Sequence, residues 1–516
     1  MPVARSITLR HGGAQPPRPA HVTPVALREL AASVGAQIQA DTAATTHPAI
    51  TGVTLRAAAV RPGDLFAALA GARHHGADFA ADALAAGAVA VLTDPGGATR
   101  VTGVPVLVHP APREVLGAAS ARVYGDPTAA LSVVGITGTS GKTTVAHLVE
   151  AGLTAAGRTV GLLGTVGTRV AGAPLPSAFT TPEAPDLQAT FAVMAEAGVT
   201  DVAMEVSSHA LAMGRVGGTR FAVGAFTNLS QDHLDFHADM EDYFATKARL
   251  FAPGGARRVV VCVDDEWGAR LAAQVTGAVT VGAGGHWHAT DGCTATDGTQ
   301  SFTAHGPDGT AVPVRLRLPG AFNVANALVA LACLDLAGVP ADIAAAAFAG
   351  VDVPGRMQRI DAGQPWLGVV DYAHKPAAVA ALLDALRVQV PGRLLVVLGC
   401  GGDRDAGKRP LMGAAAATRA ELLVVTDDNP RSEEPAAIRA AMLAGAVSAP
   451  GHGEVLEIAD RREAIMAAVA RARPGDAVVV AGKGHETGQD VGGVRHPFDD
   501  AQELTAAITA APGRTT

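Results

Sequence analysis

The segment that most constrains this chain is GITGTSGKTT, residues 135–144. It follows a compact apolar run at 131–136 and opens a stretch of helical character. A strand, a glycine-rich turn and a helix in this order predict a loop whose backbone N–H groups bind phosphate at a helix N-terminus. The usual spacing GxxxxGK[ST] is not fully kept, because the first glycine is Gly135 and position 136 is Ile136. The alternative, a surface turn that happens to contain Gly-Lys, is disfavoured by the order of strand, loop and helix.

This loop predicts a nucleoside triphosphate site rather than one reaction. Lys142 can reach the β- and γ-phosphates, and the hydroxyl of Thr143 can hold Mg²⁺. The expected ATP-binding residues of the loop are consecutive: Gly138, Thr139, Ser140, Gly141, Lys142, Thr143 and Thr144. ATPases, GTPases, kinases and ligases all use such a loop, so other segments must distinguish among them.

The composition limits the class of protein further. A length of 516 residues suggests about three domains. Hydrophobic residues make up 48% and charged residues 17%, which excludes a disordered chain. The net charge of −8 disfavours a dedicated nucleic-acid-binding protein. The apolar run at 330–351 is interrupted by Asp335, Pro340 and Asp342, so we expect no membrane span.

Strand-like runs alternate with helix-like segments and predict the α/β class with parallel sheets. Such runs lie at 159–164, 201–206 and 257–263, and again at 393–400 and 476–482. We expect a disordered tail at 1–24, a small α/β domain at 25–129, a central P-loop parallel-sheet domain at 130–353 and a C-terminal Rossmann-like domain at 354–516. The tail lacks the apolar segment of a signal peptide, and the four cysteines form no CxxC pair. We therefore expect reduced thiols in a cytoplasmic protein.

Carboxylates and imidazoles follow two of the central strand-like runs. Glu205 ends the run VTDVAM and precedes VSSHAL, a position suited to a Mg²⁺ ligand beside a phosphate loop. A second cluster follows the run at 222–226 and contains Asp232, His233, Asp235 and His237. A lone histidine is usually structural, but these lie among carboxylates after a strand. The pattern favours metal or phosphate chemistry.

Several motifs together resemble the Mur ligases, the ATP-dependent amide-forming enzymes of peptidoglycan precursor synthesis. They are GITGTSGKTT, TTPE at 180–183, EVSSHAL from Glu205 and TNLSQDHLDFHADMEDYFATK, which ends at Lys247. The resemblance implies that Lys247 is carbamylated, and carbamylation turns an ammonium into a carboxylate-like metal ligand. Without the motif, Lys247 would be interpreted as a solvated helix lysine. The implied ligands of two Mg²⁺ ions are Thr143, Glu205, His233 and Lys247, and the implied catalytic residues are Lys142, Glu205, His233 and Lys247.

The resemblance also implies contacts to ATP outside the loop. The segment 318–332, LPGAFNVANALVALA, is similar to the part of the family that lies near the nucleotide base. The amide of Asn323 offers a donor and an acceptor to an adenine edge, although the residue suits helix capping as well. Arg356, Asp371 and His374 match contacts that the family makes from its third domain. Such a domain completes the site on closure and keeps water from an activated intermediate.

The expected third domain carries polar tips after three of its strand-like runs. In an open parallel sheet, ligands bind outside the carboxyl ends of the strands, so we expect GCGGDRD, TDDNPR and AGKGHE to face one crevice. Two arginines and a glutamate suit a ligand with carboxylates and an ammonium. The sequence DNPR resembles the branch of the family that adds meso-diaminopimelate. The implied amino-acid pocket consists of Arg404, Asp428, Asn429, Pro430, Arg431, Gly482 and Glu486.

The expected first domain resembles the UDP-sugar domain of the family, through VTLRAAAVRPGDLFAALAG at 53–71. The implied contacts to a UDP-muramoyl dipeptide are Leu55, Ala57, Ala72, Arg73, His74, Thr180, Thr181, Ser207 and Arg215. The chain departs from the family pattern twice. A common DSR triplet is Arg56-Ala57-Ala58 here, and a polar residue expected near 213 is Met213.

The resemblance covers the chain from about residue 25 onward and implies a three-domain ligase. It would use ATP and Mg²⁺ to add meso-diaminopimelate to UDP-N-acetylmuramoyl-L-alanyl-D-glutamate through an acyl phosphate, without nucleic-acid or membrane partners. A lysine-adding relative is the nearest alternative, and Arg431 argues against it. A folylpolyglutamate synthase-like ligase is disfavoured by the DNPR and GGDR segments. A non-catalytic, nucleotide-gated binding module would bind ATP without turnover.

Overall fold

A computed structural model of the chain describes residues 16–39, 48–71, 73–176, 179–295 and 298–511. The predicted site residue Ala72 lies outside these ranges, as do residues 1–15 of the predicted tail. Tertiary contacts divide the chain into two compact units. The first unit consists of Met1–Thr137, Gly157–Ala225 and Thr246–Val259, and the second of Gly138–Ala156, Phe226–Ala245 and Val260–Thr516.

The first unit begins with a five-stranded sheet. Its strand order is β2 (Gln37–Gln39), β7 (Val106–Val108), β6 (Ala90–Thr93), β5 (Asp64–Ala67) and β4 (Gly52–Thr54). Only β2 runs antiparallel to its neighbour; the other pairs are parallel. A separate two-stranded pair joins β1 (Val25–Ala26) and β3 (Ala49–Ile50).

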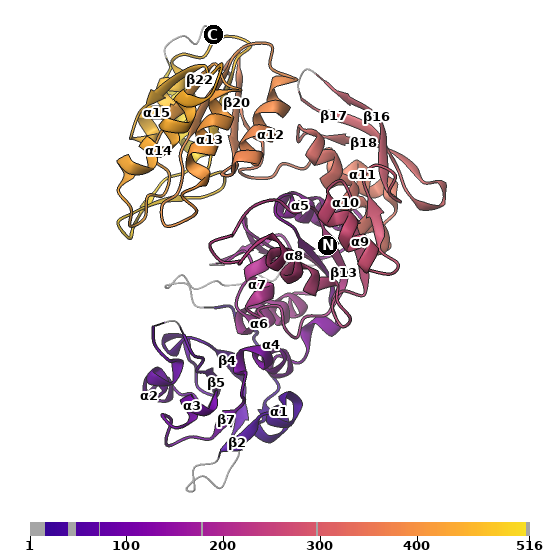
Figure 1. The fold of residues 1–516 in the computed structure, drawn as a ribbon. Helices are drawn as coiled ribbons and strands as arrows, with labels where there is room; N and C mark the ends of the chain where they lie inside the picture. Colours follow the sequence, from indigo (N-terminus) through magenta and orange to yellow (C-terminus); the bar gives the residue numbers. More distant parts are fainter. Residues whose placement is uncertain (1–15, 40–47, 72, 177–178, 296–297, 512–516) are drawn as a thin grey trace. The chain divides into compact units, whose positions relative to one another are not determined.

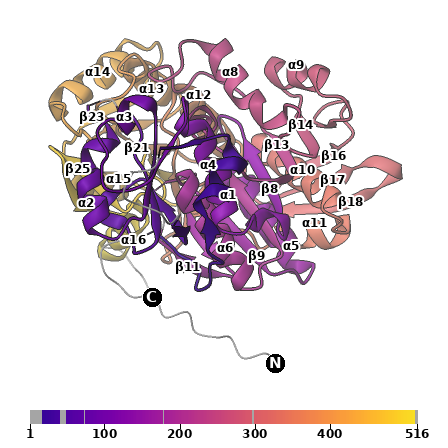
Figure 2. The ribbon, with the colours of Figure 1, turned by 90° about the horizontal axis from the view of Figure 1, so that it is seen from below.

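Helices cover both faces of this sheet (Figures 1 and 2). One face packs against α1 (Leu27–Val34) and α4 (Pro112–Val123), and the other against α2 (Ala80–Ala85), α3 (Pro95–Ala98), η1 (Ala57–Ala59) and η2 (Gly76–Phe79). The strands alternate their side chains between these two cores: Leu65 and Ala67 point to the first, and Phe66 to the second. Apolar side chains on both faces of β5 explain why its sequence reads as a continuous apolar run.

The prediction of a disordered tail is wrong for residues 16–24. The side chain of Arg18 is almost fully buried, where it pairs with Asp64 at 2.7 Å and donates to the hydroxyl of Tyr124. The backbone N–H groups of Ala20 and His21 donate to Glu196, each at 2.8 Å. A polar, proline-containing composition suggested disorder, but one buried arginine with two fixed partners orders the segment.

The central strands of the first unit have the order β11 (Ala173–Leu175), β10 (Gly167–Val170), β9 (Val160–Gly164), β12 (Asp201–Glu205), β8 (Ser132–Thr137) and β13 (Phe221–Phe226). The pairs β9–β12 and β12–β8 are parallel, as predicted. However, β9, β10 and β11 form an antiparallel meander at the edge. The two-residue connection between β9 and β10 is too short for a parallel crossover, so the hairpin turns back on itself. Elements η3 (Pro127–Ala129), α6 (Ala184–Glu196), α7 (Ser208–Ala212) and η4 (Arg249–Phe251) complete this part.

The second unit begins with the phosphate loop and α5 (Lys142–Ala155). Its other elements before the C-terminal sheet are β14 (Arg258–Cys262), α9 (Glu266–Gln274), β15 (Val279–Val281), β16 (His288–Thr294), β17 (Gln300–His305), η5 (Pro307–Gly309), β18 (Ala311–Leu316), α10 (Ala321–Leu336) and α11 (Ala341–Phe348). Strands β16, β17 and β18 form an antiparallel sheet. Helix α8 (Met240–Ala248) connects the two units along the chain.

A six-stranded sheet forms the C-terminal part, which is drawn in orange to yellow in Figure 1. Its order is β19 (Gln358–Ile360), β20 (Leu367–Asp371), β24 (Ala477–Ala481), β21 (Leu394–Leu398), β22 (Leu422–Val425) and β23 (Glu454–Glu457). All pairs are parallel except β19 with β20. One face packs on α12 (Pro376–Arg387), α13 (Lys408–Ala417) and α14 (Pro435–Ser448), and the other on α15 (Arg461–Val469) and α16 (Asp500–Ala510). The hairpin of β25 (Gly488–Val491) and β26 (Val494–Pro497) lies between β24 and α16 in sequence.

Within the described part of the chain, no helix is both long enough and apolar enough to cross a membrane. All four cysteines lie in that part and are free thiols. Burial raises the pKa of the Cys262 thiol to about 12, and it raises the pKa of Cys333 and Cys400 as well. Reactive cysteines need a lowered pKa, so these three thiols are structural.

Candidate active site

The phosphate loop begins where β8 ends. Gly138 and Gly141 have φ angles of 146° and 86°, which side-chain-bearing residues rarely adopt. A Cβ on Gly138 would overlap the hydroxyl of Thr227, and one on Gly141 would overlap the amide of Asn326. Gly135, in contrast, lies inside β8, where an added Cβ would come within 2.6 Å of the ring of Phe221. The unusual spacing of the motif therefore follows from a packing glycine in the strand, ahead of the loop.

A second segment holds the loop in place from the side. The backbone N–H of Thr139 donates to the carbonyl of Asn228 at 2.9 Å, and the N–H of Ser140 donates to its side-chain Oδ1 at 2.9 Å. The Thr227 hydroxyl donates to the carbonyl of Ser140 at 2.6 Å. The sequence singled out the downstream histidines of this segment, but it did not assign Thr227 and Asn228 a role. The motif TNLS, which contains both residues, could have indicated this role.

Lys142 and the asparagines of α10 complete the surroundings of the loop. The Lys142 ammonium donates to the carbonyls of Gly138 and Thr139, at 2.8 and 2.9 Å, so it lies over its own loop. Asn323 donates to the carbonyl of Pro319 at 2.8 Å and accepts from Asn326 at 3.0 Å. Both asparagines are buried. The side chain of Asn323 thus ties the first turn of α10 to the preceding loop. It does not cap the helix, because the N-cap residue is Gly320 and makes no side-chain hydrogen bond.

Arg356 lies close to the start of α5. Its Nη2 is 3.4 Å from the Thr143 hydroxyl, and its guanidinium lies over the ring of Tyr372 at 4.4 Å. Asp371, at the end of β20, accepts the N–H groups of Met357 and Ala373, each at 2.7 Å. Burial raises the pKa of Asp371, although Arg356 opposes this shift. The structure therefore brings together the predicted ATP contacts Thr143, Arg356 and Asp371.

A buried ion pair lies beside the predicted contact His374. Lys375 Nζ is 2.6 Å from Asp232 Oδ2, and His233 Nε2 is 3.0 Å from the same oxygen. Burial alone would raise the pKa of Asp232, but Lys375 and His233 hold it below its ordinary value. Burial and the neighbouring Lys375 lower the pKa of His374 to about 3, so this imidazole is neutral at physiological pH. The sequence did not single out Lys375, because an ion pair between segments distant in sequence leaves no local pattern.

In the first unit, Glu205 ends β12 and is paired in register with Ile136 of β8, two residues before Gly138. Only 1% of its surface is exposed. Its two carboxylate oxygens accept the N–H of Thr165 at 2.7 Å and the Thr165 hydroxyl at 3.1 Å. The Thr165 hydroxyl is also 3.0 Å from that of Thr180. Thr165 therefore orients the carboxylate, and the sequence did not assign it a role.

The remaining polar residues near Glu205 form a connected group. The Thr181 hydroxyl donates to the carbonyl of Glu205 at 2.9 Å and accepts the N–H of Ser207 at 3.2 Å. Ser207 also caps α7 by accepting the N–H of Ala210. Arg215 pairs with Glu183 at 2.8 Å and donates to the carbonyl of Thr181 at 3.2 Å. The structure thus brings Thr180, Thr181, Ser207 and Arg215 together, as the dipeptide prediction requires, while Met213 contacts Arg215 through its sulfur.

Lys247 lies in the last turn of α8 and is 1% exposed, so it is not the solvated helix lysine of the alternative interpretation. His233 has a φ angle of 54° and a half-exposed side chain. Among the described residues, no group of three or more His, Cys, Asp or Glu is arranged to hold a metal ion. The predicted ligand set includes a lysine and a threonine, and its assignment stays a prediction.

In the C-terminal sheet, the predicted amino-acid residues gather where β22 and β24 end. Asn429 donates to Glu486 Oε2 at 2.8 Å. Gly482 has a φ angle of 113°, and an added Cβ would come within 2.7 Å of Asp428 Oδ2. Arg431, also with a positive φ, donates to the carbonyl of Gly402 in the GGDR loop. Pro430 lies between Asn429 and Arg431.

Arg404 behaves differently from the rest of the predicted pocket. Its side chain is more than half exposed and pairs with Asp235 at 3.5 Å. The structure also shows a buried lysine, Lys483, among the pocket residues, which the sequence did not single out. The signal for it was present in the segment GKGHE, but a lysine in a loop is usually solvated.

The predicted UDP residues lie in two loops of the first sheet. Leu55 and Ala57 are partly buried after β4. Arg73 and His74 are exposed after β5, and the N–H of Gly71 donates to the carbonyl of His74 at 3.0 Å. His75 is next to them and lies 2.8 Å from Asp94, which caps α3. The sequence did not assign His75 and Asp94 a role.

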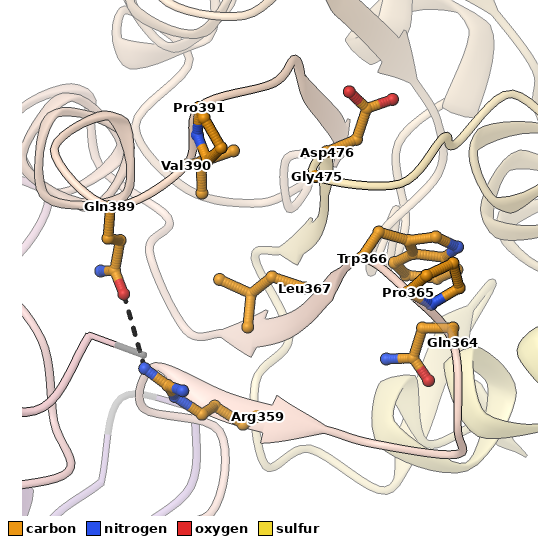
Figure 3. Close-up of a pocket in the computed structure, with 10 residues that line it drawn as sticks. All are labelled: Arg359, Gln364, Pro365, Trp366, Leu367, Gln389, Val390, Pro391, Gly475 and Asp476. Carbon is orange, nitrogen blue, oxygen red and sulfur yellow. Dashed lines mark hydrogen bonds between the residues drawn. The ribbon is translucent and has the colours of Figure 1, made fainter. Parts of the chain in front are cut away.

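A hollow of about 300 Å³ lies in the C-terminal sheet, at the end of the strands opposite to the predicted amino-acid pocket (Figure 3). Its lining includes Trp366 and Leu367 at the start of β20 and Asp476 just before β24. These are the amino ends of the strands, whereas ligands of parallel sheets bind at the carboxyl ends. No predicted site residue lines the hollow.

Three parts of the chain match family models of known proteins. Residues 49–125 match the family model described as Mur ligase family, catalytic domain, residues 136–334 match the Mur ligase middle domain, and residues 355–484 match the Mur ligase, glutamate ligase domain. The three matches fall within the three expected domains, whose boundaries stay predictions.

Two curated relatives and one solved structure extend over most of the chain. A UDP-N-acetylmuramoyl-L-alanyl-D-glutamate–2,6-diaminopimelate ligase of Streptomyces avermitilis is 53% identical, over 96% of this chain and 99% of the relative. The enzyme of the same name from Corynebacterium efficiens is 56% identical, over 86% and 87%. A solved structure with that name has a TM-score of 0.66 and 33% identity, and the match covers 95% of this chain and 99% of the solved chain.

Proposed function

Because the chain belongs to the Mur ligase family, as its motifs predicted, we propose that it adds 2,6-diaminopimelate to UDP-N-acetylmuramoyl-L-alanyl-D-glutamate. It is an ATP-dependent ligase of the α/β class that acts in peptidoglycan synthesis. The observation that carries the choice of amino acid is the charge arrangement at the carboxyl ends of β22 and β24. Arg431 there offers a guanidinium to a carboxylate, while Asp428 and Glu486 suit an ammonium. Lysine lacks the second carboxylate that Arg431 would bind.

The proposed reaction has two steps. The side-chain carboxylate of D-glutamate attacks the γ-phosphorus of ATP, the bond to the β,γ-bridging oxygen breaks, ADP leaves, and an acyl phosphate forms. An amine of diaminopimelate then attacks the acyl carbon, the C–O bond to phosphate breaks, and an amide forms with release of phosphate and a proton. Backbone N–H groups of the loop from Gly138 to Thr144 and the Lys142 ammonium would stabilise the charge that develops on the phosphates. Arg356 would add a second cation near Thr143.

We propose that the reaction uses Mg²⁺, which would neutralise charge on the transferring phosphoryl group. We propose Thr143, Glu205, His233 and carbamylated Lys247 as its ligands. Two observations support this set. Thr165 orients the carboxylate of Glu205 at the end of β12 through two hydrogen bonds. Lys247 is almost fully buried, and carbamylation would give it a carboxylate-like group that can bind a metal ion.

The dipeptide substrate would lie along the group of Thr180, Thr181, Ser207 and Arg215. Glu183 and the carbonyl of Thr181 fix the guanidinium of Arg215, so its position is set before a carboxylate binds. Such preorganisation lowers the entropic cost of orienting the reacting carboxylate. The UDP group would contact the loops of Leu55, Ala57, Arg73 and His74. We place the reaction in the reducing cytoplasm, which suits four free thiols.

The experiment that tests this proposal measures phosphate release with UDP-N-acetylmuramoyl-L-Ala-D-Glu and ATP, adding meso-diaminopimelate or L-lysine in parallel. We expect release with meso-diaminopimelate alone. Release with lysine would keep the ligase reaction but would contradict the interpretation of Arg431. If the protein binds ATP but releases no phosphate with either amino acid, the proposed reaction is contradicted. That result would favour a folylpolyglutamate synthase-like ligase or a binding module.

A further inference from the structure

Lys483 is a fully buried lysine, directly after Gly482 at the end of β24. None of its surface is exposed, and a lysine is almost never buried in this way unless it is paired. Its Nζ lies 3.0 Å from Asn429 Oδ1, 3.3 Å from Glu486 Oε2 and 3.5 Å from Asp428 Oδ1. An ammonium has three hydrogens to donate, so these three acceptors match its capacity.

The lysine fixes the orientation of the Asn429 amide. Asn429 Oδ1 accepts from Lys483 Nζ and from the backbone N–H of Asp490, each at 3.0 Å. Because both bonds require an oxygen at this position, the NH₂ group of the amide must point to Glu486, where it donates to Oε2 at 2.8 Å. The bonds from Asn429 and Lys483 both go to this one oxygen of Glu486, so they fix its position.

Lys483 also lies between two carboxylates. Asp428 and Glu486 both pair with its ammonium, at 3.5 and 3.3 Å. Two neighbouring carboxylates repel each other, and a cation between them offsets this repulsion. The lysine therefore holds both carboxylates in place at the tip of the sheet.

We propose that Lys483 is a positioning residue for the incoming amino acid. It does not contact the substrate; it holds Asp428, Asn429 and Glu486 so that they bind the second ammonium of diaminopimelate. It thereby sets the preference for an amino acid with two amines. This inference rests on the proposed function, since it requires these residues to form the amino-acid pocket.

The test compares two amino acids in the complete reaction with the full-length protein. One is meso-diaminopimelate, and the other is 2-aminopimelate, used as both enantiomers, which keeps both carboxylates and one amine but lacks the second amine. The preference is the ratio of the two kcat/KM values for each protein. We expect Lys483→Met to lower this preference at least about ten-fold and to raise the KM for diaminopimelate, with the KM for ATP unchanged. Lys483→Arg should restore most of the preference.

A matched control is Arg393→Met, at the amino ends of the strands of the same sheet. Arg393 Nη2 pairs with buried Asp476 Oδ2 at 2.7 Å, and Figure 3 shows Asp476 in the hollow there. This change also removes a cation from a buried carboxylate, so thermal unfolding should show a loss of stability. The preference for diaminopimelate should not change. A similar fall in preference in both variants would mean that the effect comes from destabilisation and would overturn the proposal.

The outcomes separate this inference from the proposed function. If the natural protein releases no phosphate with diaminopimelate, the proposed function fails before any variant is considered. If it is active, the inference is overturned when it does not distinguish the two amino acids, or when Lys483→Met keeps the preference or binds diaminopimelate more tightly. Should Lys483→Met not fold, Lys483→Gln and Lys483→Arg provide the comparison. Preference kept with Arg and lost with Gln supports the proposal, and equal preference overturns it.

Discussion

The phosphate loop and the charge cluster at the tips of β22 and β24 are built on different physical principles. The loop consists of backbone groups, and its shape depends on the positive φ angles of Gly138 and Gly141. The cluster consists of buried side-chain charges, in which Lys483 is surrounded by Asp428, Asn429 and Glu486. Sterics limit the first site, whereas charge balance limits the second.

This difference determines which substitutions matter. A methyl group in the loop has no space, because Thr227 and Asn326 already occupy the positions that a Cβ would take. In the cluster, a side chain of equal volume but different charge would fit and still change the site. We therefore expect the loop to be sensitive to added atoms, and the cluster to be sensitive to removed charge.

The largest effect is expected from Gly138→Ala. The new Cβ would overlap the hydroxyl of Thr227 and would require a φ of 146° from alanine, so the loop must shift. We expect ATP-dependent phosphate release to fall about a thousand-fold or more, because donors to phosphate act only when correctly placed. The control is Gly157→Ala after the other end of α5, with a φ of 78° but open space around it. It should keep its activity, and equal losses in both variants would show that strain rather than overlap is responsible.

The next effect concerns a second buried charge, Arg18 of the N-terminal segment. Arg18→Ala would leave the buried carboxylate of Asp64 without its partner and would also remove the bond to Tyr124. We expect the free energy of unfolding to fall by about 3 kcal/mol, measured by denaturant unfolding. Arg56→Ala breaks the more exposed pair with Asp186 and should cost less than about 1 kcal/mol. Equal losses would contradict the idea that burial makes the first pair important.

A smaller effect is expected from Arg431→Ala. Loss of the guanidinium should raise the KM for diaminopimelate about thirty-fold, which corresponds to about 2 kcal/mol. The KM for ATP should change little, because the residues of the phosphate loop are unaltered. Steady-state kinetics with each substrate varied in turn measures both values. Equal increases in the two KM values would place Arg431 outside the amino-acid pocket and would remove the distinction between the two sites.

The last prediction, whose effect is smallest near neutral pH, is a pH dependence of stability through His485, between Lys483 and Glu486 in GKGHE. Burial and the nearby Arg356 lower the pKa of His485 to about 4 from its ordinary 6.5. Between these values the unfolded chain binds a proton that the folded chain does not, so stability falls as the pH falls from 6.5 to 4. The slope contributed by one such site is at most about 1.4 kcal/mol per pH unit. Unfolding at several pH values should show a smaller slope for His485→Gln and no change for the exposed His452→Gln.

Local pattern was enough to predict the phosphate loop. Strand, glycine turn and helix follow each other within residues 132–155, and the structure contains them in that order. The same reasoning predicted the polar tips of the C-terminal sheet, because apolar runs of parallel strands end where ligands bind. It was less reliable at the edges: β10 and β11 turn antiparallel, and Arg18 orders a segment that composition alone suggested was disordered.

Sequence by itself determined the α/β class, through alternating apolar runs, and the family, through short motifs, because both patterns are local. Only the tertiary structure showed that Lys375 pairs with Asp232 and that Lys483 pairs with Asp428, since these partners lie far apart in the chain. It also distinguished Gly135, which packs inside a strand, from Gly138, which shapes the loop. The physical reason is burial. The sequence gives the type of a residue, but the role of a charged residue or a glycine depends on the residues that the fold packs around it.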